Sequence, residues 1–290
     1  MNVGILYSRI RKDEKLLLET LRDRGHEVTK IDVRRQRFDL TDSPAAVAGV
    51  DVLVDRCLAT SRSVHLTQFA EAYGVPVVNS AETATVCANK VRNSLALSAA
   101  GVPTPTTEVA FTTDTALEIV ESFGYPCVLK PVVGSWGRLM AKLDSRSAAE
   151  AVLEHKETLG HYEHKVFYIQ EFVDKPGRDI RVVAVDGEPV GAMTRTSDHW
   201  LTNAAQGAET AAFELDDEAR RLVARASEAV GGGLLGVDLM EVGGPGSGAY
   251  TVHEVNHTVE FKALNEAVDV DVPGRVVDWL EVRFGDRVVA

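Results

Sequence analysis

The feature that most constrains this fold is an alternation of strand and helix patterns over residues 2–79. Four short apolar runs have the composition of buried strands, at 2–8, 28–33, 51–54 and 76–79. Helical patterns at 12–24 and 66–73 lie between them, and Gly25 and Gly74 stop these helices. Strands that alternate with helices pair in parallel through crossover connections. The sequence therefore predicts an N-terminal α/β domain with a parallel sheet.

The later patterns alternate less regularly and predict lobes of the α+β type. Predicted helices occupy 81–100, 114–123, 216–230 and 273–284, and a further helix runs through 157 from a cap at Ser145 or Ser147. Predicted strands occupy 107–111, 127–131, 139–143, 167–172, 179–185 and 188–195. The run 101–105 ends the first of these helices, and Asp186-Gly187 is a strong hairpin signal. We expect an N-terminal domain at 1–90, a central lobe with a glycine loop at 91–186, and a C-terminal lobe at 187–290.

Composition restricts the class of protein. The chain has 290 residues and a formal net charge of −12, which argues against a nucleic-acid partner because such partners require a basic surface. No apolar run approaches the roughly 20 residues that cross a bilayer, and no signal-peptide pattern is present. We therefore expect a cytoplasmic protein that binds no membrane. Cys57, Cys87 and Cys127 have no C-x-x-C spacing, so they are predicted to be small core residues.

Polar residues interrupt two β-like runs near the C-terminus. Glu254 and Asn256 are two positions apart, so on a strand they point to one face. Asp238 lies in the apolar run 235–240, where an acid without a partner is costly. Carboxylate and amide oxygens suit magnesium, and one shared ion would give all three side chains a partner. The alternative for any one of them is a hydrogen-bonded acid or amide on a strand.

Lys130 is the interior cation of the central lobe. It follows the apolar pair 128–129 in a β run, so we expect its ammonium to point into a site, where it would suit a phosphate. Gly134 and Gly137 allow the backbone to fold closely over phosphate oxygens. The order strand–loop–strand differs from that of a Walker loop, and no G-x-G-x-x-G follows the first strand. On its own, this glycine pair does not identify a phosphate loop.

Two further groups stand at expected strand ends. The segment 170–173 interleaves polar and apolar side chains and could offer backbone groups to a purine and a carboxylate to a ribose. A plain edge strand is the alternative. Arg178, Arg181 and Arg195 open and close the predicted hairpin, and arginines that converge on a site can clamp a transferring phosphoryl group. Surface salt bridges are the alternative role for them.

In this order along the chain, these features resemble the ATP-grasp ligases of the RimK-like superfamily. Four stretches are similar to the LysX/ArgX type in particular, at 7–14, 129–138, 175–181 and 256–262. That type joins an amino acid to the amino-group carrier protein LysW in lysine and arginine biosynthesis. The resemblance covers nearly the whole chain and implies an ATP-grasp fold with an N-terminal pre-ATP-grasp domain.

The resemblance also implies roles for individual residues. ATP would be bound by Lys90, Lys130, Gly134, Ser135, Gly137, Gln170, Glu171, Phe172, Val173, Arg195 and Asn203, and Arg195 and Asn203 would also be catalytic at the γ-phosphate. Magnesium would be held by Asp238, Glu254 and Asn256, and the amino acid would lie near Asn256, Thr258 and Phe261.

The implied reaction is an ATP-dependent ligation. ATP would phosphorylate the side-chain carboxylate of the carrier's C-terminal glutamate, and the α-amine of glutamate or α-aminoadipate would attack the acyl phosphate. Magnesium and Arg195 would neutralise charge as the phosphoryl group transfers, and the glycine loop would exclude water as a lid. Relatives of this type also imply a homo-oligomer.

One departure from the family pattern leaves the amino acid open, and a second departure is milder. Where relatives commonly read N-T-A-R-G-G, residues 203–208 read N-A-A-Q-G-A. Gln206 replaces an arginine that would suit an acidic substrate, and Ala208 replaces a glycine. Asn89 stands where relatives often carry aspartate. Glutamate, α-aminoadipate or both are therefore retained as substrates.

Two other functions fit part of the same pattern. A RimK-like ligase that adds glutamate to a ribosomal protein or a cofactor would need an acceptor other than the carrier. A non-enzymatic nucleotide-binding module would bind ATP without turnover, and the complete set of Asp238, Glu254 and Asn256 argues against it. The basic segment 9–12 could meet an acidic carrier or be only the entry turn of a helix.

Overall fold

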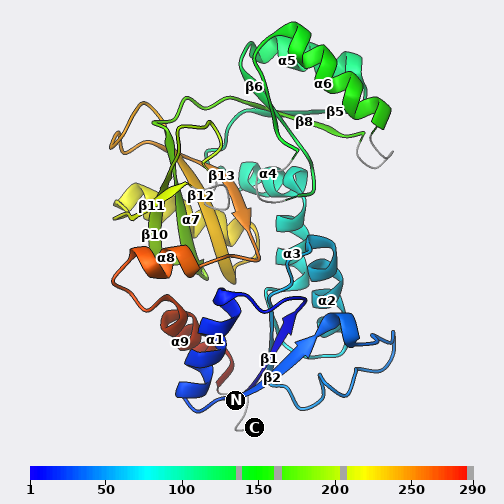
Figure 1. The fold of residues 1–290 in the computed structure, drawn as a ribbon, viewed down its shortest axis with the longest axis vertical. Coiled ribbons are helices and arrows are strands. Elements are labelled where there is room, and N and C mark those ends of the chain that lie inside the picture. The colour runs from blue at the N-terminus through cyan, green and yellow to red at the C-terminus, as the bar shows by residue number, and fades with distance from the viewer. Residues whose placement is uncertain (135–138, 160–164, 203–207, 286–290) are drawn as a thin grey trace.

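The computed structural model describes residues 1–134, 139–159, 165–202 and 208–285. Within them the chain forms three sheets, each with its own helices (Figure 1). The N-terminal sheet lies at the bottom of that view, the largest sheet in the middle, and the sheet of the central lobe at the top. The predicted α/β class with α+β lobes is confirmed.

The N-terminal sheet has the strand order β2-β1-β3-β4, and all of its neighbours pair in parallel, as predicted. Its strands are β1 (Asn2–Tyr7), β2 (Glu27–Asp32), β3 (Val52–Asp55) and β4 (Val77–Val78), with the short helix η1 (Val33–Arg35) after β2. Gly25 and Gly74 follow α1 (Lys12–Asp23) and α2 (Thr60–Ala72) with φ of 79° and 71°, a conformation that ends a helix without a Cβ clash. α2 begins earlier than predicted because its first turn is polar and carries no apolar periodicity.

Residues 81–100 form two helices where the sequence predicted one. α3 (Ala81–Ala88) and α4 (Lys90–Ala99) meet at Asn89, whose backbone is extended, with φ of −126° and ψ of 118°. The Asn89 side chain accepts hydrogen bonds from two backbone N–H groups in the first turn of α4, at 3.0 and 3.2 Å. It is therefore an N-cap, and the new helix starts with Lys90 at its first position.

The central lobe is an antiparallel sheet with two helices on it. The strand order is β5-β8-β6-β7, from β5 (Thr107–Ala110), β6 (Cys127–Lys130), β7 (Ala141–Leu143) and β8 (Phe167–Glu171). The helices α5 (Thr113–Phe123) and α6 (Arg146–Leu159) lie side by side at the top of Figure 1. Together they leave Cys127, Leu143 and Ile169 fully buried in the core of this lobe.

The largest sheet is antiparallel, with the order β11-β10-β9-β12-β13. Its strands are β9 (Arg178–Val185), β10 (Glu188–Thr196), β11 (Glu209–Ala212), β12 (Leu234–Glu241) and β13 (Tyr250–Asn256). α7 (Asp217–Ala229) packs on this sheet, and α8 (Lys262–Ala267) and α9 (Val272–Phe284) follow it in the chain. The hairpin of β9 and β10 turns at residues 186–187, as predicted. β11 was not predicted, because all its residues are exposed and it lacks apolar alternation.

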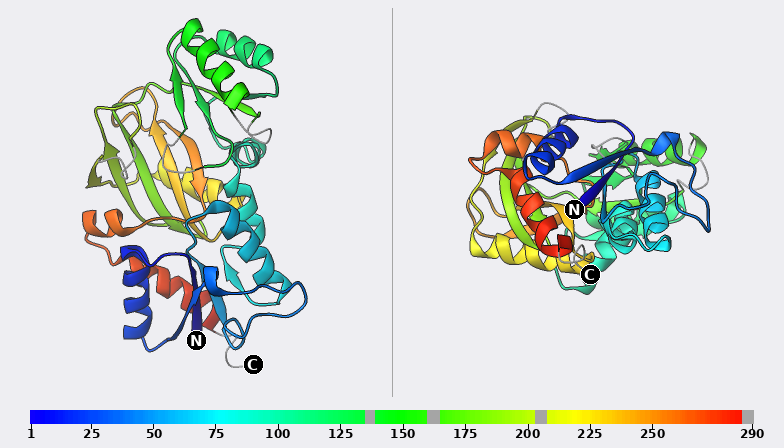
Figure 2. Two further views of the ribbon diagram at one scale, coloured as in Figure 1. Left: turned by 45° about the vertical axis from the view of Figure 1, so that its right-hand side comes forward. Right: turned by 90° about the horizontal axis from the view of Figure 1, so that it is seen from below.

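One apolar core joins the N-terminal sheet to the largest sheet. It contains Ile5 of β1 and Leu21 of α1 together with Val183 of β9 and Leu280 of α9. Seen from below in Figure 2, α9 lies beside α1. The segment between β13 and α8 runs along this joint, where Val259 is fully buried. The two sheets are therefore packed as one body around the segment in which substrate residues were predicted.

Two predictions from composition can be compared with the fold. Among the helices of the described residues, none is long and apolar enough to cross a membrane. Cys57, Cys87 and Cys127 are buried and free, which confirms their assignment as core residues. Burial raises the pKa of the Cys127 thiol to about 11, so this thiol stays protonated and unreactive.

Asn79 ties the N-terminal domain to the largest sheet. Its side-chain Nδ2 donates to the carbonyls of Leu234 and His257 at 2.8 and 2.6 Å, and its Oδ1 accepts from the Leu234 N–H at 2.7 Å. We expect Asn79→Ala to lower the free energy of unfolding by about 2 kcal/mol, because it leaves buried backbone groups without partners. Urea unfolding followed by circular dichroism measures this loss. Ser98→Ala on the exposed side of α4 is the control and should change stability little.

Candidate functional site

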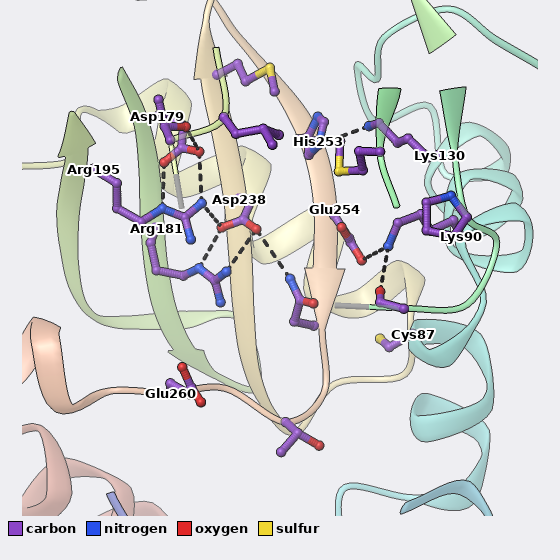
Figure 3. Close-up of a pocket in the computed structure, with 18 of the residues that line it drawn as sticks. Cys87, Lys90, Lys130, Asp179, Arg181, Arg195, Asp238, His253, Glu254 and Glu260 are labelled. Carbon is purple, nitrogen blue, oxygen red and sulfur yellow. Dashed lines mark hydrogen bonds and ion pairs between the residues drawn. The ribbon is translucent and has the colours of Figure 1, made fainter. Parts of the chain in front are cut away.

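A cavity of about 590 Å³ opens where the three lobes meet (Figure 3). This volume is typical of a small-molecule site. Strands β6, β8, β9, β10, β12 and β13 contribute to its wall, together with the first residues of α1 and α4. Twelve of the residues to which the resemblance gives a role line it: Lys90, Lys130, Gly134, Gln170, Glu171, Phe172, Val173, Arg195, Asp238, Glu254, Asn256 and Thr258.

Lys130 projects from the end of β6 and is 3% exposed. Its ammonium donates to Gln170 Oε1, and it lies 3.0 Å from His253 Nε2. Burial lowers the pKa of Lys130 to about 7; Glu254 opposes this shift, and two other cavity lysines add to it. A polyanion in the cavity would restore the charge of this lysine, so the site favours such a ligand.

Lys90, at the start of α4, joins three parts of the cavity wall. Its Nζ lies 2.7 Å from Glu254 Oε1 on β13 and donates to the carbonyl of Gly134 at 3.2 Å. The backbone N–H of Lys90 donates to the Val132 carbonyl at 2.9 Å. This lysine therefore holds the segment after β6 against the acid predicted to bind metal.

Asp238 on β12 lies between two arginines. Arg181 Nε and Nη2 lie 2.6 and 3.0 Å from its Oδ1 and Oδ2, and Arg195 Nη2 lies 3.0 Å from its Oδ1. Asn256 Nδ2 donates to the same carboxylate at 3.3 Å (Figure 3). One buried negative charge is thus shared by two cations.

Asp179 organises the neighbouring wall. It accepts from Arg195 Nε and Nη2 at 2.6 and 2.9 Å and also from the Thr202 hydroxyl. Lys175 Nζ donates to Thr202 Oγ1 at 2.6 Å and lies 3.8 Å from Asp179. Burial opposes the charge on Arg195, but Asp238 and Asp179 hold the pKa of this guanidinium above its usual value. Arg195 is therefore a permanent, rigidly held cation.

A β-bulge sets the direction of the side chains on β13. Asp238 lies opposite Glu254 and Leu239 lies opposite Val252, so His253 is an extra residue in the pairing. Because of this bulge, His253 and Glu254 both line the cavity, although neighbours on a regular strand point to opposite faces. Burial and then the nearby Lys130 keep the pKa of His253 well below its usual value, so this histidine is neutral.

The three predicted metal ligands meet in this cavity. Asp238 lies directly opposite Glu254 across the strand pair, and Asn256 is hydrogen-bonded to Asp238. Within the described residues, no group of three or more His, Cys, Asp or Glu side chains is arranged to hold a metal, and the predicted set has two such residues and an amide. Magnesium commonly takes one or two carboxylates, with substrate phosphates and water as its other ligands. The residues present fit that pattern, and their role as ligands stays a prediction.

The strand end predicted to hold adenine forms one wall. Gln170 is 2% exposed and uses its Oε1 to hold Lys130, so it positions a cation. The Glu171 carboxylate accepts a backbone N–H of the segment before β5 at 2.8 Å. Phe172 and Val173 complete the wall, which thus offers a ring, an apolar side chain and backbone groups to a flat base. Adenine binding here stays a prediction.

Thr258 lines the cavity, but Phe261 does not. Phe261 is fully buried in the core between the two large lobes. Its N–H donates to Asp13 Oδ1 at 2.7 Å, and its ring lies 5.3 Å from the guanidinium carbon of Arg56. Phe261 thus anchors the segment that carries Thr258.

The segment 7–14, one of the stretches similar to the LysX/ArgX type, also contributes Arg11, Lys12 and Asp13 to the cavity wall. Arg11 bonds both oxygens of Glu14, at 2.7 and 3.0 Å, and pairs with Glu260. Burial opposes the charge of Glu14, but Arg11 and Arg56 lower its pKa. Lys12 lies 2.7 Å from Glu266 of α8. Arg11 and Lys12 therefore already have acidic partners across the joint.

Sequence reasoning missed several residues of the cavity: Lys175, Thr202, His253 and Glu260. Lys175 and Glu260 stood inside the family-specific stretches, which was the only available signal. Ser135, Gly137 and Asn203 lie outside the described residues, as does Gln206. Their predicted roles stay predictions.

Comparison with known proteins agrees with this geometry. Residues 3–86 match the model of the LysX preATP-grasp domain, and residues 87–280, more than half of the chain, match that of the RimK-like ATP-grasp domain. A relative from Saccharolobus solfataricus named alpha-aminoadipate–LysW ligase LysX is 35% identical over 87% of this chain and 90% of its own length. The glutamate–LysW ligase ArgX of Sulfolobus acidocaldarius is 29% identical over 98% and 99%.

A solved structure shares the whole architecture. The RimK domain ATP-grasp protein from Sphaerobacter thermophilus superposes with a TM-score of 0.80 and 29% identity, covering 96% of this chain and 99% of that one. The two family models match nearly the whole chain, which agrees with the observed order of lobes and with the cation-lined cavity. The chain belongs to the RimK-like ATP-grasp ligase family and carries the LysX preATP-grasp domain at its N-terminus.

Proposed function

We propose that this protein is an ATP- and magnesium-dependent ligase of amino-acid biosynthesis. It joins the α-amino group of glutamate or α-aminoadipate to the side-chain carboxylate of the C-terminal glutamate of a LysW-like carrier protein, through an acyl phosphate. The pathway is that of arginine, lysine or both. The relatives named LysX and ArgX support this carrier and these amino acids.

The observation that carries the proposal is the charge pattern of the cavity. Lys90 and Lys130 stand on one side, and the Asp238 carboxylate stands between two arginines on the other. Such a site can hold a polyphosphate with a divalent ion next to a second substrate. The residues proposed to bind ATP, metal and amino acid are those assigned from the sequence, with Phe261 as an anchor of the substrate segment.

The chain's own residues supply most of the chemistry. Lys90 and Lys130 bind phosphate oxygens, and Arg195 offsets the charge that develops as the phosphoryl group moves to the carrier carboxylate. Magnesium, when bound, neutralises phosphate charge. The α-amine then attacks the acyl carbon, a C–N bond forms, the C–O bond to phosphate breaks, and the amine loses a proton.

A single assay tests the function and the choice of amino acid. Purified enzyme, ATP, magnesium and carrier are mixed with glutamate or with α-aminoadipate, and the mass of the carrier is measured. We expect a mass gain with at least one of them. No gain with either, together with ADP release that needs a different acceptor, would favour the alternative RimK-like ligase. ATP binding without turnover under any of these conditions would favour a binding module.

Lys130 makes ATP binding depend on pH. Burial lowers its pKa to about 7 in the free protein, so it is charged below this pH and loses its proton above it. Bound phosphates favour the charged form and raise the pKa again. We therefore expect the affinity for ATP to fall as the pH rises through about 7, with uptake of a proton on binding. Titration calorimetry in buffers of different ionisation enthalpy measures this proton.

Two variants separate the proton uptake at Lys130 from that of other groups. Lys130→Arg carries a charge that is not lost at these pH values, so it should bind ATP without proton uptake. Lys165→Arg, at an exposed position outside the cavity, should behave as the wild type. An ATP affinity that does not change between about pH 6 and 8 would contradict the role of Lys130.

Other parts of the sequence interpretation stay predictions. The division at 1–90, 91–186 and 187–290 can be compared with the two family matches, which meet between residues 86 and 87. The homo-oligomer and the cytoplasmic location also rest on the sequence and the resemblance. Light scattering of the purified protein measures the oligomeric state directly.

A further inference from the structure

Arg181 and Arg195 both bind Asp238, but only Arg195 has a second carboxylate. Asp179 accepts two hydrogen bonds from Arg195, at 2.6 and 2.9 Å. Arg181 contacts no acid other than Asp238 within the described residues. If Asp238 gives its oxygens to a metal ion, Arg195 keeps a partner and Arg181 does not.

A divalent ion on Asp238 would also repel both guanidinium groups. Arg181 is largely buried, with a side-chain exposure of 15%, and a guanidinium cannot lose its charge in a protein. A buried charge without a partner is strongly unfavourable. The metal-loaded site therefore requires a new anion next to Arg181.

The position of Arg181 decides which anion that is. A methyl group on Gly236 would lie 2.7 Å from Arg181 Nη1 and 2.8 Å from a methyl carbon of Val259. The free end of Arg181 thus occupies space that only a glycine leaves open, beside the segment that carries Thr258. In Figure 3, Arg181 lies on the side of Asp238 toward Glu260, and Arg195 lies on the side toward Asp179. Arg181 therefore lies beside the segment predicted to meet the amino acid, whereas Arg195 is held on the other side by Asp179.

We propose that Arg181 binds the α-carboxylate of the incoming amino acid. This inference rests on the proposed function and names the part of the amino acid that the site holds. A guanidinium fork matches a carboxylate in a bidentate pair. The α-carboxylate is attached to the same carbon as the attacking amine, so holding it also orients the amine toward the acyl phosphate. Glutamate and α-aminoadipate share this group, and Arg181 does not distinguish between them.

Binding measurements without the carrier test the proposal. Titration calorimetry follows L-glutamate and L-α-aminoadipate binding to protein loaded with magnesium and a non-hydrolysable ATP analogue. We expect Arg181→Met to weaken both amino acids by about 10- to 100-fold and by the same factor, with the affinity for the nucleotide changed little. Arg181→Lys, which keeps the charge but loses the fork, should be intermediate. In turnover assays the change should appear in KM for the amino acid more than in kcat.

Isoglutamine, in which an amide replaces the α-carboxylate of glutamate, provides a matched ligand. Wild-type protein should bind it more weakly than glutamate, and Arg181→Met should bind the two equally, because the variant lacks the group that senses the difference. Continued discrimination by a folded Arg181→Met would overturn the assignment. So would failure of the wild type to bind either acidic amino acid.

The affinity for magnesium distinguishes this role from structural support of Asp238. A supporting residue would make magnesium bind more weakly when it is removed. Arg181 competes with the ion for the same oxygens, so Arg181→Met should bind magnesium as tightly as the wild type or more tightly. Weaker binding by a folded variant would contradict the proposal, and Arg181→Lys serves if the methionine variant does not fold. Amino-acid binding that depends on Arg181 without any carrier product would refute the proposed function but not this inference.

Discussion

Replacing Glu254 by alanine is expected to abolish ligase turnover while the fold stays intact. The Glu254 carboxylate lies opposite Asp238 and pairs with Lys90 at 2.7 Å. Its removal halves the negative charge proposed for the metal and leaves Lys90 without its acid. A metal ion that neutralises transferring phosphate contributes several kcal/mol, so we expect kcat to fall by at least roughly a thousandfold. ADP release in the presence of carrier and amino acid measures this change.

The fold should survive because Glu254 contributes little to packing. Its neighbours Val252 and Val255 are fully buried and hold β13 in place, whereas the side chain of Glu254 faces the cavity. Glu254→Gln keeps the shape without the charge and should also be inactive. Glu118→Ala, at an exposed position on α5, should keep full activity. Near-normal ADP production by a folded Glu254→Ala would refute the metal site.

Local patterns were sufficient to predict the N-terminal sheet. Its strands are short apolar runs, and its helices end at Gly25 and Gly74, so the strands and the helix ends depend on neighbouring residues alone. The approach of Asp238 to Glu254 was also expected, because one magnesium ion was predicted to bind both, although the strand register itself was not predicted. These features depend on periodicity, which a single sequence contains.

Features that depend on tertiary packing could not be predicted in this way. The bulge at His253 requires knowledge of how β12 and β13 pair, and it alone turns this histidine toward Lys130. A phenylalanine such as Phe261 suits the wall of a binding site as well as a hydrophobic core. Only its packing against α1 shows that it belongs to the core. Asparagine commonly caps helices, but the helical pattern continues on both sides of Asn89, so the sequence did not indicate that one helix ends and another begins there.

The network around Asp179 is a third case. Lys175 is four residues from Asp179, whereas Arg195 and Thr202 are 16 and 23 residues away, and all three converge on its carboxylate. The arginine residue type alone is equally compatible with a surface salt bridge, which is why the sequence left that alternative open for Arg195. Burial makes the difference: Asp179 is 8% exposed and Arg195 is 7% exposed. A buried ion pair with additional hydrogen bonds fixes geometry, which exposed pairs do not.

Arg195→Ala is expected to lower kcat far more than it weakens ATP binding. Asp179 holds the guanidinium by two hydrogen bonds, so its charge is already in place when the phosphoryl group moves. A preorganised charge of this kind acts most strongly on the transition state, and removing one typically costs about 100- to 1,000-fold in kcat. Lys90 and Lys130 remain to bind the nucleotide, so KM for ATP should rise by less than about tenfold.

A loss of activity in Arg195→Ala has to be separated from a loss of structure. Removing the guanidinium leaves Asp179 buried with Thr202 and Lys175 as its remaining partners, which destabilises the folded protein. In the double variant Asp179→Asn/Arg195→Ala the unpaired charge is gone, so thermal stability should recover. Turnover should not recover, because Arg181 is already paired with Asp238 and the double variant supplies no cation in the place of Arg195. If turnover recovers together with stability, Arg195 acts only as a structural partner of Asp179 and has no direct effect on phosphoryl transfer.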